Sequence, residues 1–132
     1  IPLRLVGSEM CIRDSICTLK YRWINQNPFK SIFWAAQGMA AEFATGVLLM
    51  REIELSKKNI SMLLIDVEAK FIKKAVGKIS FKCDKGLMIK EKVGSLNSQK
   101  TKSTMWIDSI GIDESGEEVS KFKFNWSILL KE

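Results

Sequence analysis

The sequence predicts an α+β domain in which one antiparallel sheet wraps around a single long helix. Residues 31–51 are apolar on nearly every side of a helix, and the segments around them alternate apolar and polar residues with the period of a strand. The sequence contains no internal repeat, and no linker separates these segments. The 132 residues suffice for one domain, and 46% hydrophobic with 27% charged residues is typical of a globular chain.

The first fifteen residues, IPLRLVGSEMCIRDS, share no periodicity with the rest of the chain. The tract VGSEMCIRDS resembles a spurious sequence that recurs at the ends of translated assembled reads. We therefore expect residues 1–15 to be foreign to the fold and residues 16–132 to form a single domain that lacks its native N-terminal piece. The alternative is an ordinary first strand in LRLVG.

Residues 17–24 have the alternation expected of a half-buried strand. One face of this predicted strand consists of Cys17, Leu19, Tyr21 and Trp23. A loop comes next at Asn27-Pro28, where Pro28 biases Asn27 away from helical angles. Ser31 is the predicted cap of the helix.

The predicted helix carries a stripe of small residues with one acid in it. The stripe consists of Ala35, Gly38, Glu42, Thr45 and Gly46. Large apolar residues occupy the other faces, so the helix must be covered on most sides. The stripe permits either close packing of another backbone or the approach of a slim ligand.

Four strands are predicted after the helix. In residues 61–73 one face is apolar, with Leu63, Ile65, Val67, Ala69 and Phe71. Gly77 marks the turn into a strand over 78–83, and residues 84–101 fit either a short helix or strand residues with a loop. A strand over 103–112 and a turn at 113–116 precede the last strand. Its inward residues are Phe122, Phe124, Trp126, Ile128 and Leu130.

Composition excludes several kinds of site. The chain has no histidine, which removes Ser-His-Asp and Cys-His catalysis and every imidazole zinc site. The three cysteines form no C-x-x-C pair, so we expect no metal, no cofactor and a reducing, cytoplasmic compartment. Residues 32–50 are not expected to span a membrane, because Glu42 and Gln37 interrupt the apolar run and a central acid costs about 2.5 to 3.5 kcal/mol.

One constellation has a catalytic interpretation. Asn27-Pro28 is followed, fifteen residues after the asparagine, by Glu42. On these residues the sequence resembles the hotdog-fold superfamily, specifically its phenylacetyl-CoA-thioesterase-like branch and an uncharacterised family related to it. The branch reads roughly H-N-P-x-G-x-x-H-G-G before an acid in the helix, and this chain reads QNPFKSIFWA. Gln26 and Phe33 replace the histidines, and Trp34-Ala35 replaces Gly-Gly.

The resemblance implies a hotdog domain that hydrolyses an acyl-CoA or other thioester. Glu42 would be the general base or nucleophile, and Asn27 would orient the water or the carbonyl. The implied substrate-binding residues are Phe33, Trp34, Ala35, Gln37 and Gly38. Hotdog domains generally form homodimers or dimers of dimers with the site between subunits, and exposed lysines could meet the phosphates of coenzyme A.

Other interpretations stay open at this stage. The missing His and Gly-Gly positions fit a non-catalytic protein that binds an acyl group or a CoA ester, and Glu42 could be a buried acid with a structural partner. The net charge of +6 also fits a basic nucleic-acid-binding module. We do not expect nucleic acid as a partner, because the lysine-bearing strand faces lack regularly spaced aromatics.

Overall fold

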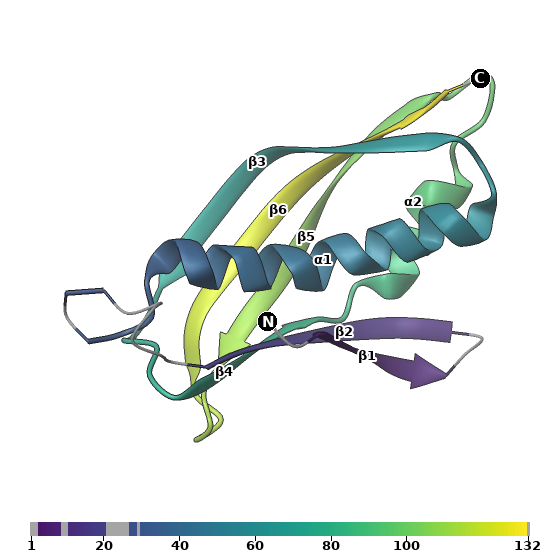
Figure 1. Cartoon of the computed structure of the whole chain (residues 1–132). Coiled ribbons are helices and arrows are strands. Elements are labelled where there is room, and N and C mark those ends of the chain that lie inside the picture. The colour runs from purple at the N-terminus through teal and green to yellow at the C-terminus, as the bar shows by residue number, and fades with distance from the viewer. Residues whose placement is uncertain (1–2, 9–10, 21–26, 29, 132) are drawn as a thin grey trace.

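The structure is a computed structural model that describes residues 3–8, 11–20, 27–28 and 30–131, and side chains from residue 14 onward. Its elements are β1 (Leu3–Ser8), β2 (Cys11–Lys20), α1 (Trp34–Ser56), β3 (Ile60–Phe71), β4 (Lys78–Cys83), α2 (Gly86–Gly94), β5 (Lys102–Ile112) and β6 (Glu118–Leu130). All strands pair antiparallel in the order β1-β2-β4-β5-β6-β3. Figure 1 shows α1 crossing one face of this curved sheet, with β1 and β3 at its two edges.

The long helix starts and ends later than predicted. It runs from Trp34 to Ser56 rather than over 31–51, and its N-cap is Phe33, without a side-chain hydrogen bond to the first turn. Ser31 is therefore not the cap. Its hydroxyl instead accepts a hydrogen bond from Asn27 Nδ2 at 2.9 Å, and this bond holds Ser31 in the loop before the helix. The helix ends where Lys57 adopts a left-handed conformation with φ of 57°.

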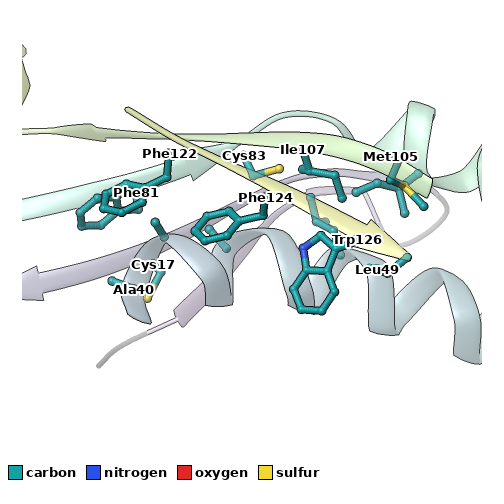
Figure 2. Packing of buried hydrophobic residues seen from close by; sticks show 14 of the residues in the cluster. Cys17, Ala40, Leu49, Phe81, Cys83, Met105, Ile107, Phe122, Phe124 and Trp126 are labelled. Atoms are coloured by element: carbon teal, nitrogen blue, oxygen red, sulfur yellow. The ribbon is translucent and has the colours of Figure 1, made fainter. Parts of the chain in front are cut away.

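The core lies between α1 and the sheet. The helix buries Ala40, Ala41, Ala44, Leu48 and Leu49. In the last strand Phe122, Phe124, Trp126 and Ile128 point inward, as predicted, and Figure 2 shows the rings of β6 above the helix. The predicted strands over 78–83 and 103–112 are confirmed as β4 and β5, and the segment left open contains α2.

The small-residue stripe of α1 faces β6. A Cβ atom added to Gly38 would lie 3.7 Å from Cε2 of Phe122, and one added to Gly46 would lie 3.6 Å from Cζ2 of Trp126. Trp126 Nε1 donates to Thr45 Oγ1 at 3.1 Å, which fixes α1 to the sheet on this side. Gly38, Thr45 and Gly46 therefore serve close packing of helix against strand.

The face assignment predicted for β3 is wrong in its first half. A bulge between Leu64 and Asp66 shifts the register against β6, so Leu64 faces Trp126 and Val67 faces Phe124. The residues on the side of α1 are consequently Met62, Leu64, Val67, Ala69 and Phe71. Leu63 points to the opposite face and is 65% exposed. Bulges reverse an alternation that sequence periodicity assumes to be unbroken.

The beginning of the chain forms a hairpin at the other edge. β1 pairs with β2, and the Ser15 hydroxyl donates to the Ala44 carbonyl of α1. Tyr21 and Trp23 of the predicted first strand lie outside the described residues. That residues 1–15 are foreign to the fold stays a prediction. Neither helix in the described part of the chain combines the length and apolarity needed to cross a membrane.

Candidate functional site

A cavity of about 490 Å³ opens at the N-terminal end of α1, and we call it the α1 cavity. Three segments surround it: the loop before the helix, the first turn of α1, and the chain that leaves β3. Its lining residues are Asn27, Pro28, Ser31, Ile32, Phe33, Trp34, Gln37, Phe71, Ile72, Lys73, Lys74 and Ala75. Four of the seven residues predicted for the site, Asn27, Phe33, Trp34 and Gln37, thus come together here.

Backbone and side-chain hydrogen bonds hold the loop against its neighbours. Ile32 N donates to Ala75 O at 2.8 Å, which fastens the start of the helix to the segment after β3. Asn27 N donates to Ser31 O at 2.7 Å, and Ser31 N donates to Asn27 Oδ1 at 3.2 Å. The described contacts of the Asn27 side chain therefore shape the loop that forms one wall of the cavity.

The first turn of α1 faces the cavity without a side-chain cap. The N–H groups of Trp34 and Ala35 are among the first of the helix and have no acceptor within it. They lie at the positive end of the helix dipole, which favours negative charge nearby. The Trp34 side chain is 60% exposed, and its ring centroid is 6.0 Å from that of Phe33. The entrance therefore combines apolar surface with amide donors.

Gln37 places a buried acceptor beside this cavity. Its side chain is only 5% exposed, and Nε2 donates to Ile32 O at 3.3 Å. No described residue donates to Oε1 of Gln37. A buried acceptor without a donor costs about 1 to 3 kcal/mol. A donor on a ligand or a water molecule would remove this cost.

Glu42 does not reach the cavity of its own chain. It is half-buried on α1, eight residues beyond Trp34, which corresponds to about 12 Å along the helix axis. Ala35, Gly38 and Glu42 are absent from the described residues that line the cavity. The structure therefore does not bring Glu42 and Asn27 together within one chain.

Lys73 and Lys74 line the cavity wall, and two carboxylates neutralise the charge of Lys73. Lys73 Nζ lies 2.8 Å from Asp113 and 2.7 Å from Glu117, and these hydrogen bonds, first that to Asp113, raise the pKa of Lys73. The same contact, with the Ser115 hydroxyl, holds the pKa of Asp113 well below its usual range. Sequence reasoning missed the segment 71–75 as a wall of the site. The acidic residues at 113–117 are the feature of the sequence from which an ion-pair partner for a lysine could have been predicted.

Neither a cluster of metal-ligating side chains nor a reactive thiol is found in the described part of the chain. They contain no group of three or more metal-ligating side chains. Burial raises the pKa of the Cys17 thiol to about 11 and that of Cys83 to about 12. Both thiols are therefore protonated at neutral pH and are poor nucleophiles.

The sequence matches, over residues 9–128, the family described as a domain of unknown function, DUF4442. No curated protein matches it. Three solved structures are similar. A protein of unknown function from Pseudomonas aeruginosa is 16% identical with a TM-score of 0.77, over 98% of this chain and 83% of that one. A thioesterase enzyme from Staphylococcus aureus, solved as a glutamine-to-alanine variant, is 12% identical with a TM-score of 0.69, over 96% and 93%. A Bacillus halodurans protein solved with CoA is 12% identical with a TM-score of 0.62, over 89% and 68%.

Proposed function

The chain belongs to the DUF4442 family and has the hotdog fold of thioesterase-like proteins, and from this premise we propose that it hydrolyses an acyl-CoA thioester. The observation that carries the proposal is the α1 cavity, where an uncapped helix N-terminus meets apolar walls and the unpartnered acceptor of Gln37. A thioester needs these features: a slot for an apolar chain and donors for an oxyanion. The CoA bound to the Bacillus halodurans protein supports the substrate class.

In this proposal the substrate lies along the cavity with its carbonyl at the first turn of α1. The N–H groups of Trp34 and Ala35 donate to the carbonyl oxygen, and the helix dipole stabilises the negative charge that develops there. Phe33 and Trp34 cover the acyl chain. Lys74 adds positive charge near the phosphates of coenzyme A, whereas the charge of Lys73 is neutralised by Asp113 and Glu117.

Glu42 acts on the substrate bound by a partner subunit. The separation of about 12 Å along α1 prevents it from serving its own cavity, and a homodimer removes this difficulty if Glu42 of each subunit faces the cavity of the other. The Staphylococcus aureus thioesterase enzyme supports the choice of residues. It has been solved with a glutamine and with a glutamate replaced by alanine, fifteen positions apart. Asn27 and Glu42 have the same spacing.

The reaction consumes one water molecule. The Glu42 carboxylate takes a proton from water as the water oxygen bonds to the thioester carbon, and the carbonyl electrons move onto the oxyanion. The oxyanion then reforms the carbonyl, the carbon–sulfur bond breaks, and the departing thiolate takes up the proton. A carboxylic acid and free CoA thiol are formed. Gly38, placed by the fold against Phe122, keeps its role in helix packing.

The test is thiol release from a panel of acyl-CoA esters of different chain length. The wild-type protein is compared with Glu42→Gln and with Glu91→Gln, a matched change at an exposed position on α2. We expect hydrolysis of at least one ester by the wild type and by Glu91→Gln, with a loss of about 10²-fold or more in Glu42→Gln. Hydrolysis that is equal in all three proteins, or none with any ester, would refute the proposal.

A second candidate is a protein that binds an acyl-CoA without hydrolysing it. The observation in its favour is the Trp34-Ala35 pair, where the thioesterase-like branch has Gly-Gly. An indole at the first helical position limits how closely a carbonyl approaches the amides. This candidate requires saturable binding of the ester by both the wild type and Glu42→Gln, with no thiol released by either.

A further inference from the structure

We propose that the end of the molecule at which α1, α2 and β6 finish docks on an anionic membrane surface. Figure 1 shows these segments together at one end, with the start of α1 at the other. The helix is 23 residues long, so about 34 Å separates this end from the α1 cavity, and docking leaves the cavity open. The proposal does not depend on thioester hydrolysis.

Hydrogen bonds join segments of this end that lie far apart in the sequence. Lys131 N donates to Asn59 O at 2.7 Å, and Leu130 N donates to Thr101 O at 2.7 Å. Lys58 Nζ reaches from the turn after α1 to three carbonyl oxygens around the C-terminal end of α2, the closest at 2.8 Å. The turn after α1, the end of α2, the loop before β5 and the end of β6 therefore form one surface.

Lysines dominate this surface, which we call the basic end. Residues 54–60, 87–102 and 129–131 contain seven lysines and two acids, Glu54 and Glu91, which gives a net charge of +5. The whole chain has a net charge of +6, so most of it is concentrated here. Glu132 follows in the sequence and lies outside the described residues. The lysines of the basic end are Lys57, Lys58, Lys90, Lys92, Lys100, Lys102 and Lys131.

The charge of the basic end is not neutralised by the described part of the chain. None of its seven ammonium groups has a described carboxylate within ion-pair distance, although four lysines elsewhere do. The acidic turn at 113–117 lies at the opposite end of β5 and β6, where it pairs with Lys73. Positive charge is thus left at one end, and an anionic bilayer attracts each lysine that comes near its surface.

Exposed apolar side chains border the basic end on the outer face of the sheet. Leu63 is 65% exposed, Trp106 is 42% exposed and Leu129 is 40% exposed, and we call these three the outer patch. In the register of the sheet, Leu63 lies opposite Ser127 and Trp106 lies opposite Asn125. Ser127 and Asn125 are buried although they belong to the outer face, because the larger side chains beside them close over them.

The outer patch and the basic end meet at Leu129. Lys102 lies directly opposite Leu129 on the same face of the sheet. A lysine can lay its aliphatic stem along apolar surface while its charge stays at the level of the phosphates. On the far side of the patch, Asp66 accepts a hydrogen bond from Asn125 Nδ2 at 3.1 Å. Apolar side chains that enter the interface, together with cations that meet anionic headgroups, are the two contributions that hold a protein on a bilayer.

Charge and residue type distinguish a bilayer from other partners. A second copy docked through the same surface would bring the lysines of both copies together, which repel each other. Single-stranded nucleic acid stacks its bases on several aromatic rings, whereas the outer patch offers Trp106 beside two leucines. Contacts with phosphates alone would leave those leucines in water, and a bilayer covers them.

Vesicle sedimentation tests the role of charge. Vesicles of equal parts phosphatidylcholine and phosphatidylserine should bind the wild type in a salt-sensitive way, and phosphatidylcholine alone should bind it much more weakly. The test variant removes three lysines of the basic end: Lys100→Gln, Lys102→Gln and Lys131→Gln. The matched control removes three lysines elsewhere on the sheet: Lys70→Gln, Lys78→Gln and Lys82→Gln. Each lysine near the bilayer contributes about fivefold in affinity, so the test variant should bind about 100-fold more weakly. The control should lose less than about fivefold, because salt screens distant charges. Equal losses in both variants, or no binding by the wild type, overturn the proposal.

Trp106 reports which face enters the bilayer. Its emission, taken as the difference between the wild type and Trp106→Phe, should shift to shorter wavelength when mixed vesicles are added. Leu63→Ser should bind about tenfold more weakly, and its circular dichroism should match the wild type because this side chain is largely exposed. Unchanged Trp106 emission in protein that sediments with vesicles overturns the docking face. Binding to a single-stranded RNA homopolymer in place of vesicles, lost in the lysine variant, would assign the basic end to nucleic acid and overturn the proposal.

Discussion

The hydrogen bond from Trp126 Nε1 to Thr45 Oγ1 gives the sharpest test of how α1 is seated on the sheet. Both side chains are buried, and Thr45 Oγ1 also donates to Glu42 O at 2.9 Å, so this contact holds the turn of the helix that carries Glu42. A buried hydrogen bond contributes about 0.5 to 1.5 kcal/mol, and the smaller ring of Trp126→Phe leaves additional unfilled space. We expect Trp126→Phe to lower the free energy of unfolding by about 2 kcal/mol, which corresponds to roughly 4 to 8 °C in Tm.

A double-mutant cycle isolates the hydrogen bond from the packing change. Urea unfolding is measured for the wild type, Trp126→Phe, Thr45→Val and the double variant. Because either single change removes the same contact, the double variant should be more stable than the sum of the single losses predicts, by about 0.5 to 1.5 kcal/mol. Additive losses, within about 0.3 kcal/mol, would show that this contact does not hold α1.

Further changes probe the rest of the fold. Gly111→Ala should destabilise by about 1 to 3 kcal/mol in urea unfolding, because its Cβ would lie 2.7 Å from a buried ring carbon. Gly38→Ala should instead stabilise by about 0.5 to 1 kcal/mol, since its Cβ finds 3.7 Å of room inside a helix; equal signs for both would contradict the packing described. Asp113→Asn should lower stability above the unfolded pKa of 3.8, and the difference from wild type should shrink as pH falls below that value, because the folded pKa of Asp113 is depressed. A difference that grows in acid would contradict this. In a Cys11→Ser background, Cys17 and Cys83 should react with a thiol reagent only at the rate of unfolding, and rapid reaction of the folded protein would show that they are accessible.

Strand periodicity predicted the parts of the fold in which one face is buried throughout. In β6 apolar and polar residues alternate in the sequence from Phe122 to Ile128, and the inward residues were identified correctly, although Asn125 and Ser127 on the opposite face are buried as well. In β3 the same reasoning failed at Ile65, because a bulge depends on the register with β6 and leaves no mark in the periodicity of one strand. Ser31 fits the cap position by residue type, but the competing hydrogen bonds to Asn27 moved the helix start to Trp34.

For the site, the sequence indicated the loop and first turn, because Asn27, Trp34 and Gln37 are close along the chain. The wall formed by Phe71 and Lys73 was not predicted, since it depends on β3 returning alongside the start of the helix. The distance of Glu42 from the cavity was also missed. The fifteen residues between Asn27 and Glu42 can be converted into a distance only when it is known how many of them are helical.

Ester binding and thiol release measured together on the same protein give the most direct test of the hydrolase. Wild type and Glu42→Gln are titrated with the acyl-CoA ester that the wild type turns over fastest, and bound ester and free CoA thiol are followed in the same samples. We expect both proteins to bind with similar dissociation constants, and only the wild type to release thiol at a catalytic rate. Equal thiol release by both proteins, or binding by neither, would contradict the assignment of the α1 cavity and Glu42 to thioester hydrolysis.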